Sequence, residues 1–449
     1  MADTTHATLT KTLAEADPLI PGGNPWSSYM VGLYLNGRGP QPLGTVVPEE
    51  IEERAKEKLK GHGGSFMYAG GSAGSNATYR ANLKAFEKWG IIPRMLVNAT
   101  HRSLETTIFG VTHSCPVFIA PIGVQAIFTE HAECNPARAA KALNVPLILS
   151  TASSRTIEEV AEANGDSHRW YQLYWPRNND VTVSLLSRAK KCGYSALVVT
   201  LDTMSLGWRP HDLETSYLPF KHGVGAQIGL SDPVFMAKFG KDPRIGEQFH
   251  PKWPYDPKEL DYKIFKEKDA ETTEAAKLGT EWLKEANSGF YRDWEDLKFV
   301  RKTWEGPLIL KGIQSVMDAE LAIDNGIDGI IVSNHGGRQV DGAIPSLLAL
   351  ETIMKSQKVK AAQASGKFTV LFDSGIRTGS DIFKAIALGA QAVLLGRPWL
   401  YGSIIAGQAG VEQVLKHTLA DLDSTLSLAG YTNLEQIRGK ADEVLMRID

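Results

Sequence analysis

Residues 329–342 read GIIVSNHGGRQVDG. An apolar run with the length of a strand, GIIVS, is followed at once by a polar loop in which two glycines separate His335 from Arg338. Continuously apolar strands are typical of parallel sheets that helices cover on both faces. The segment therefore predicts a parallel α/β fold in which polar loop residues follow the C-terminal end of a buried strand.

Seven further apolar runs flank this segment, and stretches with helical spacing lie between them. The eight expected strands are residues 116–120, 145–150, 170–174, 196–201, 307–312, 329–333, 369–373 and 392–396. Helices are expected over 135–144, 155–164, 180–193, 316–326, 346–357 and 379–389, several of them ending at Gly or Asn. Eight such units predict a (β/α)8 TIM barrel, and an open doubly wound sheet is the alternative.

Two segments lie outside this repeat. Residues 1–110 contain a polar arm, an expected helix around PEEIEERAKEKLKG and a glycine-rich turn, and we expect them to cover the bottom of a barrel formed by residues 111–449. Residues 211–296, between the fourth and fifth strands, are far longer than an ordinary βα loop. Their charged part, 258–287, is most simply a solvated helix or mobile loop, although a place above the barrel mouth would let it act as a lid.

The bulk composition favours a soluble protein that acts on small molecules. A net charge of −3 and the lack of a dense Lys/Arg block argue against a nucleic-acid partner. Three scattered cysteines argue against a disulfide framework or zinc site, and Cys115 is expected to be a plain core thiol in a reducing compartment. Neither a secretory signal nor an apolar run of the ~20 residues that span a bilayer is found. We therefore expect a cytoplasmic location, no membrane partner and no metal.

The loops after the eight strands are unusually polar. In a (β/α)8 barrel these loops converge on one mouth, which would gather residues from half of the chain: Gln172, Tyr174, Thr200, Asp202, Arg209, Lys311, His335 and Arg338. Each residue alone is more commonly explained by a structural hydrogen bond. Eight polar residues at one mouth instead indicate a binding or catalytic site.

The loops after the last two strands read DSGIRTGSD and LGRP. Barrels often bind a phosphate there with backbone amides, an arginine and a helix N-terminus. Gly375 would let the backbone approach closely, and Arg377 and Arg397 can neutralise a dianion. A phosphorylated ligand is implied.

The remaining ionisable groups suit chemistry on an anionic substrate. Arg209 and Arg338 fit bidentate binding of a carboxylate. Asp202 beside His335 fits a base whose positive form is stabilised as it takes a proton. Lys311 could compensate negative charge on a bound cofactor, and the two glycines would leave room for the base and the carboxylate anchor to approach one substrate.

The ordered motifs QLYWP, TLDT, GWRP, LKGI, SNHGGRQ, DSGIR and LGRP resemble the FMN-dependent L-2-hydroxy acid oxidase and dehydrogenase family. The resemblance runs from about residue 65 to the C-terminus and is greatest to the lactate 2-monooxygenases, which also share RANLKAFEKWG, PRML and APIGV. It implies FMN at the barrel mouth, a small L-2-hydroxy acid and O2 as substrates, and a homotetramer or homo-octamer.

The resemblance also implies roles for individual residues. His335 would be the base oriented by Asp202, and Arg209 and Arg338 would bind the substrate carboxylate. Tyr68 and Tyr174 would contact the substrate carboxylate or hydroxyl. The positions expected to contact FMN are Ser150, Gln172, Thr200, Lys311, Ser333, Asp373, Gly375, Arg377, Gly396 and Arg397. Whether the α-hydrogen leaves as a proton or as a hydride stays open, because both routes deliver a proton to His335.

Gly123 bears on the fate of the product. Many oxidases of the family carry Thr-Ala where this chain has Ile122 and Gly123, and the monooxygenases have Gly there. Extra room beside the flavin would let pyruvate stay and be decarboxylated, so the resemblance predicts conversion of L-lactate and O2 into acetate, CO2 and water. The alternatives are an oxidase that releases 2-keto acid and H2O2, a dehydrogenase with another acceptor, and a barrel that binds FMN without turnover. Gly123 could also be a tight packing point of the backbone.

Two features depart from the family pattern. The loop after the seventh strand reads DSG where DGG is usual, a change that should leave the phosphate site intact. The 211–296 insertion is longer than the corresponding loop of the lactate monooxygenases, and it therefore leaves the size of the substrate open.

Overall fold

Eight parallel strands close into a barrel in the computed structural model, which describes residues 25–62 and 64–448. In barrel order they are β4 (Val117–Ile119), β5 (Leu147–Ser150), β6 (Arg169–Leu173), β7 (Leu197–Thr200), β8 (Leu308–Ile313), β9 (Gly329–Val332), β10 (Thr369–Phe372) and β11 (Ala392–Leu395). Pairing of β11 with β4, Val393 opposite Val117, closes the ring. The predicted (β/α)8 barrel is confirmed, and every strand overlaps the apolar run that predicted it.

The strands are continuously apolar because both of their faces are buried. One set of side chains points into the barrel, where Phe118, Trp170, Ile309 and Leu371 belong to one closed cluster. The alternate residues pack outward against the helices in a second, larger cluster. A barrel interior filled by bulky side chains is a packed core rather than a pore, and each fully buried side chain of this kind contributes about 1.5–3 kcal/mol to folding.

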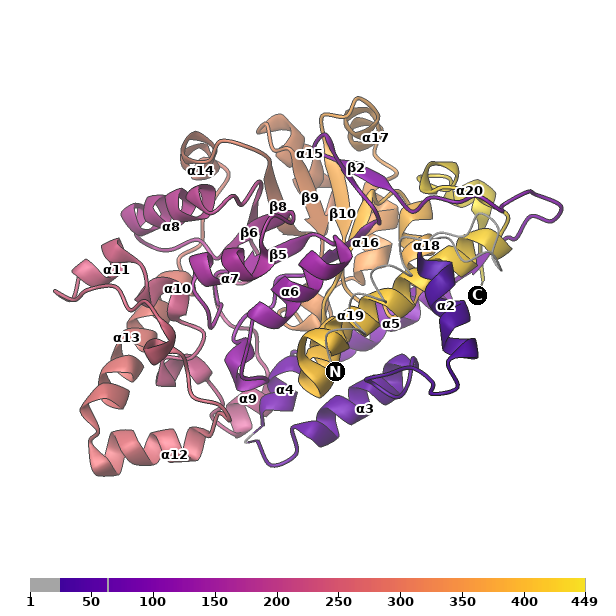
Figure 1. Cartoon of the computed structure of the whole chain (residues 1–449). Coiled ribbons are helices and arrows are strands. Elements are labelled where there is room, and N and C mark those ends of the chain that lie inside the picture. Colours follow the sequence, from indigo (N-terminus) through magenta and orange to yellow (C-terminus); the bar gives the residue numbers. More distant parts are fainter. Residues whose placement is uncertain (1–24, 63, 449) are drawn as a thin grey trace.

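A hairpin of β2 (Thr106–Ile108) and β3 (Val111–His113) covers the N-terminal end of the barrel. Its two-residue turn has positive φ at both Phe109 and Gly110, 50° and 76°, as tight hairpin turns require. The Phe109 ring lies 5.7 Å from that of Trp170 inside the barrel. The hairpin is therefore the element that closes the end opposite the mouth (Figure 1, top).

The helices of the repeat surround the barrel (Figure 1). They are α6 (Cys134–Leu143), α7 (Ile157–Asn164), α8 (Asn179–Lys191), α14 (Leu297–Thr303), α15 (Val316–Asp324), α16 (Ser346–Ile353), α17 (Gln357–Ala364), α18 (Gly379–Ala387) and α19 (Arg397–Leu428). The helix predicted over 346–357 is divided, because Ser356 caps a new helix, α17. Neither α19 nor any other helix in the described part of the chain is long and apolar enough to cross a membrane.

The N-terminal segment contains α2 (Pro25–Leu35), α3 (Pro48–Lys58), α4 (Ser65–Gly70), α5 (Ala77–Glu87) and β1 (Trp89–Ile91). Helices α2 and α3 pack on α19, and β1 pairs with the C-terminal strand β12 (Leu445–Arg447), which follows α20 (Ala441–Val444). The expectation that this segment covers the bottom of the barrel is wrong for α4, because Tyr68 and Ala69 line a cavity at the mouth. Figure 1 shows α4 at the end opposite β2. The first 24 residues of the predicted arm lie outside the described residues.

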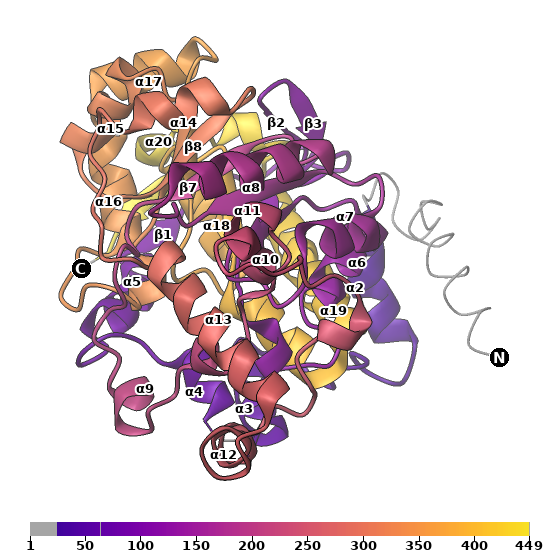
Figure 2. The same ribbon diagram turned by 90° about the vertical axis from the view of Figure 1, so that its left-hand side faces the viewer.

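The insertion after β7 is folded. It contains α9 (Pro210–Glu214), the 3-10 helix η2 (Pro219–His222), α10 (Gln227–Leu230), α11 (Pro233–Ala237), α12 (Pro257–Tyr262) and α13 (Ala270–Ala286). The expectation of a solvated helix or mobile loop over 258–287 is wrong for α13, whose Trp282 is fully buried. The Trp282 ring packs edge to face on Phe235 at 5.1 Å. Figure 2 shows α13 running across the molecule in front of the barrel.

Candidate active site

A cavity of about 190 Å³ lies at the C-terminal ends of the barrel strands. Most of the predicted site residues line it, although they come from α4, from strand β8, from the start of α19 and from the loops after six other strands. They are Tyr68, Gly123, Tyr174, Arg209, Lys311, His335, Arg338, Asp373, Gly375, Arg377, Gly396 and Arg397. The convergence expected from a barrel is thus present for this set.

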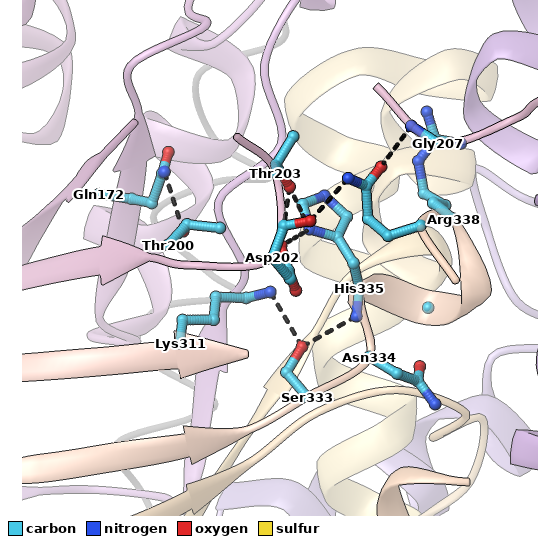
Figure 3. A network of polar contacts seen from close by, with 12 residues as sticks. Gln172, Thr200, Asp202, Thr203, Gly207, Lys311, Ser333, Asn334, His335 and Arg338 are labelled. Carbon is cyan, nitrogen blue, oxygen red and sulfur yellow. Dashed lines mark hydrogen bonds and ion pairs between the residues drawn. The ribbon is translucent and has the colours of Figure 1, made fainter. Parts of the chain in front are cut away.

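The other predicted residues are buried directly behind the cavity wall. Gln172 Nε2 donates to Thr200 Oγ1 at 2.9 Å, and Lys311 Nζ donates to Ser333 Oγ at 3.0 Å (Figure 3). Ser150 Oγ accepts from the backbone N–H of Ala152 at 3.2 Å. These groups orient one another and the groups that line the cavity.

His335 and Asp202 form a largely buried pair, whose side chains are 19% and 12% exposed. His335 Nδ1 lies 2.8 Å from Asp202 Oδ1, and Thr203 Oγ1 donates to the same carboxylate oxygen at 2.7 Å (Figure 3). Because Nδ1 faces the carboxylate, it carries the proton and leaves Nε2 as the basic atom. The arrangement suits a base that accepts a proton at Nε2.

The conformation of the loop that carries His335 explains why two glycines follow this residue. His335, Gly336 and Gly337 have φ of 58°, 65° and 78°, a run of left-handed residues that turns the chain after β9. A Cβ at Gly336 would lie 2.6 Å from Arg397 Nη1, and one at Gly337 would lie 2.7 Å from the backbone N of Tyr79. Both the backbone conformation and the crowding therefore require glycine.

The electrostatics of the pair keep His335 neutral. Burial lowers the pKa of His335, and the positive charges of Lys311 and Arg209 act in the same direction while Asp202 opposes them. Burial alone would raise the pKa of Asp202, but His335 and Lys311 hold it below its ordinary value. The resting pair is an ionised carboxylate beside an imidazole that is free to accept a proton.

Three arginines lie close together beside the pair. Arg209 Nε donates to the backbone oxygen of Arg338 at 3.2 Å, and Arg338 Nη1 and Arg397 Nη2 both donate to the backbone oxygen of Gly71, at 2.9 and 3.2 Å. Burial, with the neighbouring Arg209 and Arg397, lowers the pKa of Arg338 to about 9. Asp212 Oδ2 lies 3.9 Å from Arg209 Nη1. Buried positive charge of this kind favours an anionic ligand.

Two tyrosines complete this side of the cavity. Burial raises the pKa of Tyr174 to about 12, and it also raises that of Tyr68, so both hydroxyls keep their protons at neutral pH. The Arg338 guanidinium lies 5.7 Å from the centre of the Tyr68 ring. Both tyrosines can therefore donate hydrogen bonds to an anion held by the arginines.

The other end of the cavity fits a phosphate. Arg377 Nη2 is buried and has no hydrogen-bond partner among the described residues, although it lines the cavity. Gly396 precedes the first turn of α19, and a Cβ there would meet no atom closer than Ile122 Cδ1 at 3.9 Å. A guanidinium nitrogen without a partner, a glycine with no close contact and a helix N-terminus together suit a phosphate dianion.

Sequence reasoning missed the role of Gln339. Its Nε2 donates to the backbone oxygens of Asp202 and Ser205 at 2.7 and 2.9 Å, and its Oε1 accepts from Arg209 Nη2 at 3.0 Å. The residue joins the loop after β7 to the loop after β9. Its place directly after Arg338 was the available signal, but the direction of its side chain depends on the packing of the two loops.

An apolar wall was also missed. Phe220 of η2 and three residues of α13, Trp282, Leu283 and Ala286, line the cavity together with Leu206. The insertion therefore forms part of the site. The sequence placed it near the mouth but did not assign these side chains to the cavity.

Gly123 is a packing point in this structure. A Cβ there would lie 2.5 Å from the backbone oxygen of Ala152 and 2.6 Å from its Cβ. The neighbouring residue, Val124, donates a backbone hydrogen bond to the same oxygen at 2.7 Å. The close approach of two loops is sufficient to require glycine, so Gly123 carries no evidence about the fate of the product.

Comparisons with known proteins agree with this geometry. The family model described as FMN-dependent dehydrogenase matches residues 55–443. The chain is 41% identical over 413 residues to an FMN-dependent alpha-hydroxy acid dehydrogenase of Schizosaccharomyces pombe, covering 91% of this chain and 93% of the relative. It is 36% identical to an L-lactate oxidase of Lysinibacillus sphaericus, covering 87% and 90%. A crystal structure of mandelate oxidase with 3,3-difluoro-2-hydroxy-3-phenylpropionic acid superposes with a TM-score of 0.68 at 32% identity, covering 88% of this chain and 98% of that one.

Proposed function

Because the chain belongs to the FMN-dependent dehydrogenase family and is an FMN-dependent oxidoreductase of 2-hydroxy acids, we propose that its substrate is a small L-2-hydroxy acid oxidised to the 2-keto acid at the barrel mouth. The observation that carries the proposal is that a base and a carboxylate clamp line one cavity. His335 is the base, paired with Asp202 at 2.8 Å, and Arg209 and Arg338 are the clamp. A protein that only bound a phosphorylated ligand would need neither.

The residues present fit FMN. Arg377, whose Nη2 has no partner among the described residues, would hold the phosphate with the α19 N-terminus, and Arg397, which donates to the backbone oxygens of Ala69, Gly336 and Gly71, would add positive charge. Asp373 and Gly375 would contact the ribityl chain and phosphate, and Lys311 would face the ring system. Ser150, Gln172, Thr200 and Ser333 would hydrogen-bond the ring or support Lys311. FMN, when bound, accepts the two electrons that the substrate loses.

The side chains of the cavity bind the substrate and accept its proton. Arg209 and Arg338 bind the carboxylate and fix the substrate's orientation. Tyr68 and Tyr174, both protonated, donate hydrogen bonds to the carboxylate or the hydroxyl. His335 Nε2 accepts a proton as the C–OH group becomes a carbonyl, and the ionised Asp202 stabilises the positive imidazole that results.

We further propose the coupled reaction of a lactate 2-monooxygenase, in which L-lactate and O2 give acetate, CO2 and water. The motifs quoted above and the wall of α13, which would retain the keto acid beside the peroxide formed with it, support this finer assignment. An oxidase that releases pyruvate and H2O2, or a dehydrogenase that passes electrons to another acceptor, shares the same first half-reaction. The resemblance also supports a cytoplasmic homotetramer or homo-octamer, which light scattering after size-exclusion chromatography would test.

Product analysis tests the assignment. The purified yellow protein is incubated with L-lactate in air, and acetate, pyruvate and peroxide are quantified together. Acetate without free peroxide is the expected result. Pyruvate with stoichiometric peroxide would make the enzyme an oxidase, and the absence of any turnover of 2-hydroxy acids would overturn the proposed function itself.

A further inference from the structure

We propose that the insertion after β7 builds a subsite for the side chain of the substrate, and that the preferred substrates are 2-hydroxy acids with an apolar side chain larger than the methyl group of lactate. The inference rests on the proposed oxidation of 2-hydroxy acids and refines its substrate class: lactate remains a substrate, and acids with larger apolar side chains react faster. It assigns specificity to Leu283 and Ala286 of α13, which sequence reasoning left outside the site.

The cavity is polar on one side and apolar on the other. The carboxylate clamp and the base occupy the polar side, while the insertion contributes Phe220, Trp282, Leu283 and Ala286. Leu283 and Ala286 are half-buried and offer aliphatic carbon surface to a ligand, whereas Trp282 is fully buried within the insertion. A methyl group would cover little of this surface, whereas a branched or longer alkyl chain would remove more of it from water.

The apolar residues of α13 form a regular stripe. Gly279, Trp282, Leu283 and Ala286 follow the i, i+3, i+4, i+7 spacing of one helix face. A Cβ at Gly279 would lie 2.4 Å from the backbone oxygen of Phe220, so the missing side chain allows close packing of α13 on η2. The stripe thus faces η2 and the cavity, while Lys284 on the same helix remains 65% exposed.

The C-terminal end of α13 is tied to the catalytic loops. Asn287 Nδ2 donates to the backbone oxygen of Thr203 at 2.7 Å, and the Gly289 N–H donates to that of Met204 at 2.8 Å. The Glu285 carboxylate accepts from the Asn178 N–H at 3.0 Å, in the loop after β6. Thr203 is the residue next to Asp202, so the wall is anchored to the backbone that positions the base. A wall fixed in this way selects side chains by size and polarity.

The experiment measures the reductive half-reaction. Anaerobic bleaching of the bound flavin by L-lactate, L-2-hydroxybutyrate and L-2-hydroxyisocaproate is followed by stopped-flow spectroscopy, because this step precedes any difference in product fate. We expect the second-order rate constant to rise about fourfold for each added methylene. L-Malate, which carries a second carboxylate, should bleach the flavin far more slowly than any of the three.

Variants of α13 test whether its side chains cause the preference for larger substrates. Ala286→Leu fills the subsite, so it should lower the rate with 2-hydroxyisocaproate at least tenfold more than it lowers the rate with lactate. Leu283→Ala should shift the preference toward still larger side chains. Lys284→Ala is the matched control on the exposed face of α13 and should leave the ratio unchanged. FMN content and Tm verify folding.

Three outcomes would overturn the inference in distinguishable ways. Rapid bleaching by lactate but not by the longer acids would remove the side-chain subsite and leave the proposed function standing. An unchanged ratio in both Ala286→Leu and Leu283→Ala would place the specificity elsewhere. Bleaching by none of the acids would overturn the subsite and the proposed function together.

Discussion

Gln339 Nε2 donates a hydrogen bond to the backbone oxygen of Asp202 at 2.7 Å. The carboxylate partner of the proposed base is therefore held by a residue of the loop that carries the base itself. The amide oxygen of Gln339 accepts from Arg209 Nη2 at 3.0 Å, so one side chain joins the proton-accepting pair to the carboxylate clamp.

We expect Gln339→Ala to raise KM for a 2-hydroxy acid about tenfold or more, since a hydrogen bond to a charged group contributes about 1.5–3 kcal/mol. Gln339→Glu is the informative comparison, because it keeps an acceptor for Arg209 and loses the donor to Asp202. It should lower kcat with a smaller effect on KM. Steady-state kinetics of both variants test these two roles of Gln339. An equal effect on KM in both variants would contradict the assignment of substrate binding to its acceptor and of proton transfer to its donor.

Replacing His335 tests the assignment of the base. His335→Gln should retain the yellow flavin, because the imidazole acts on the substrate, whereas Arg377 and the α19 N-terminus are the groups proposed to hold the phosphate. Substrate added without air should fail to bleach this variant, whose side chain has no basic nitrogen. Normal bleaching measured by absorbance would remove His335 from its role.

Asp202→Asn should lower kcat by about 10²–10⁴, because an amide neither fixes the imidazole tautomer nor stabilises its positive form. FMN content should be unchanged. The substitution also removes the negative charge that opposes burial, so the pKa of His335 should fall further. Single-turnover flavin reduction across pH measures both effects. Retention of the wild-type rate would show that the 2.8 Å contact is only structural.

The pH dependence of kcat/KM should report the neutral state of His335. Burial lowers the pKa of this residue below its ordinary value of 6.5, and only the neutral imidazole accepts a proton. As pH falls through the lowered pKa, kcat/KM should drop about tenfold per unit, while it should already be level at neutral pH. If kcat/KM already begins to fall above pH 6.5 as the pH is lowered, the group that titrates is not His335.

Arg377→Leu should weaken FMN binding tenfold or more, since its Nη2 would lose a charge-assisted hydrogen bond to the phosphate. Fluorescence of flavin released on dilution gives the Kd directly. Arg138→Leu, on the exposed face of α6, is the matched control and should bind FMN as the parent chain does. If Arg377→Leu binds FMN as tightly as the parent chain does, the phosphate binds in another part of the cavity.

The sequence could predict the barrel because each strand is buried on both faces. A continuously apolar run such as GIIV is expected only where a strand is covered on both sides. It could also predict the convergence of His335, Arg338 and Lys311, because strand ends in a barrel share one mouth. Tyr68 was reached only by family resemblance, since nothing local to α4 shows which end of the barrel it meets. The α13 stripe was visible as spacing, but its charged neighbours concealed that Trp282 is buried.

Gln339 and Gly123 are two residues whose roles could not be predicted from the sequence around them. The partners of Gln339 lie more than a hundred residues away in the chain, so its role follows from the packing of two loops. Gly123 suggested chemistry from family comparison, whereas contact with Ala152 explains it by packing. In both cases the deciding contact joins segments that local sequence does not relate.

The pairing of β1 with β12 places a constraint on how the chain becomes an enzyme during its synthesis. Helices α2 and α3 pack on α19, which is made long after them, and Trp89 of β1 pairs with Arg447 of β12. A nascent chain can form early strands on the ribosome, but β1 gains its partner only once β12 has been made. Such long-range closure is slow and leaves surfaces exposed while it is pending. A chain that stops before β12 would therefore leave β1 without the strand that pairs with it.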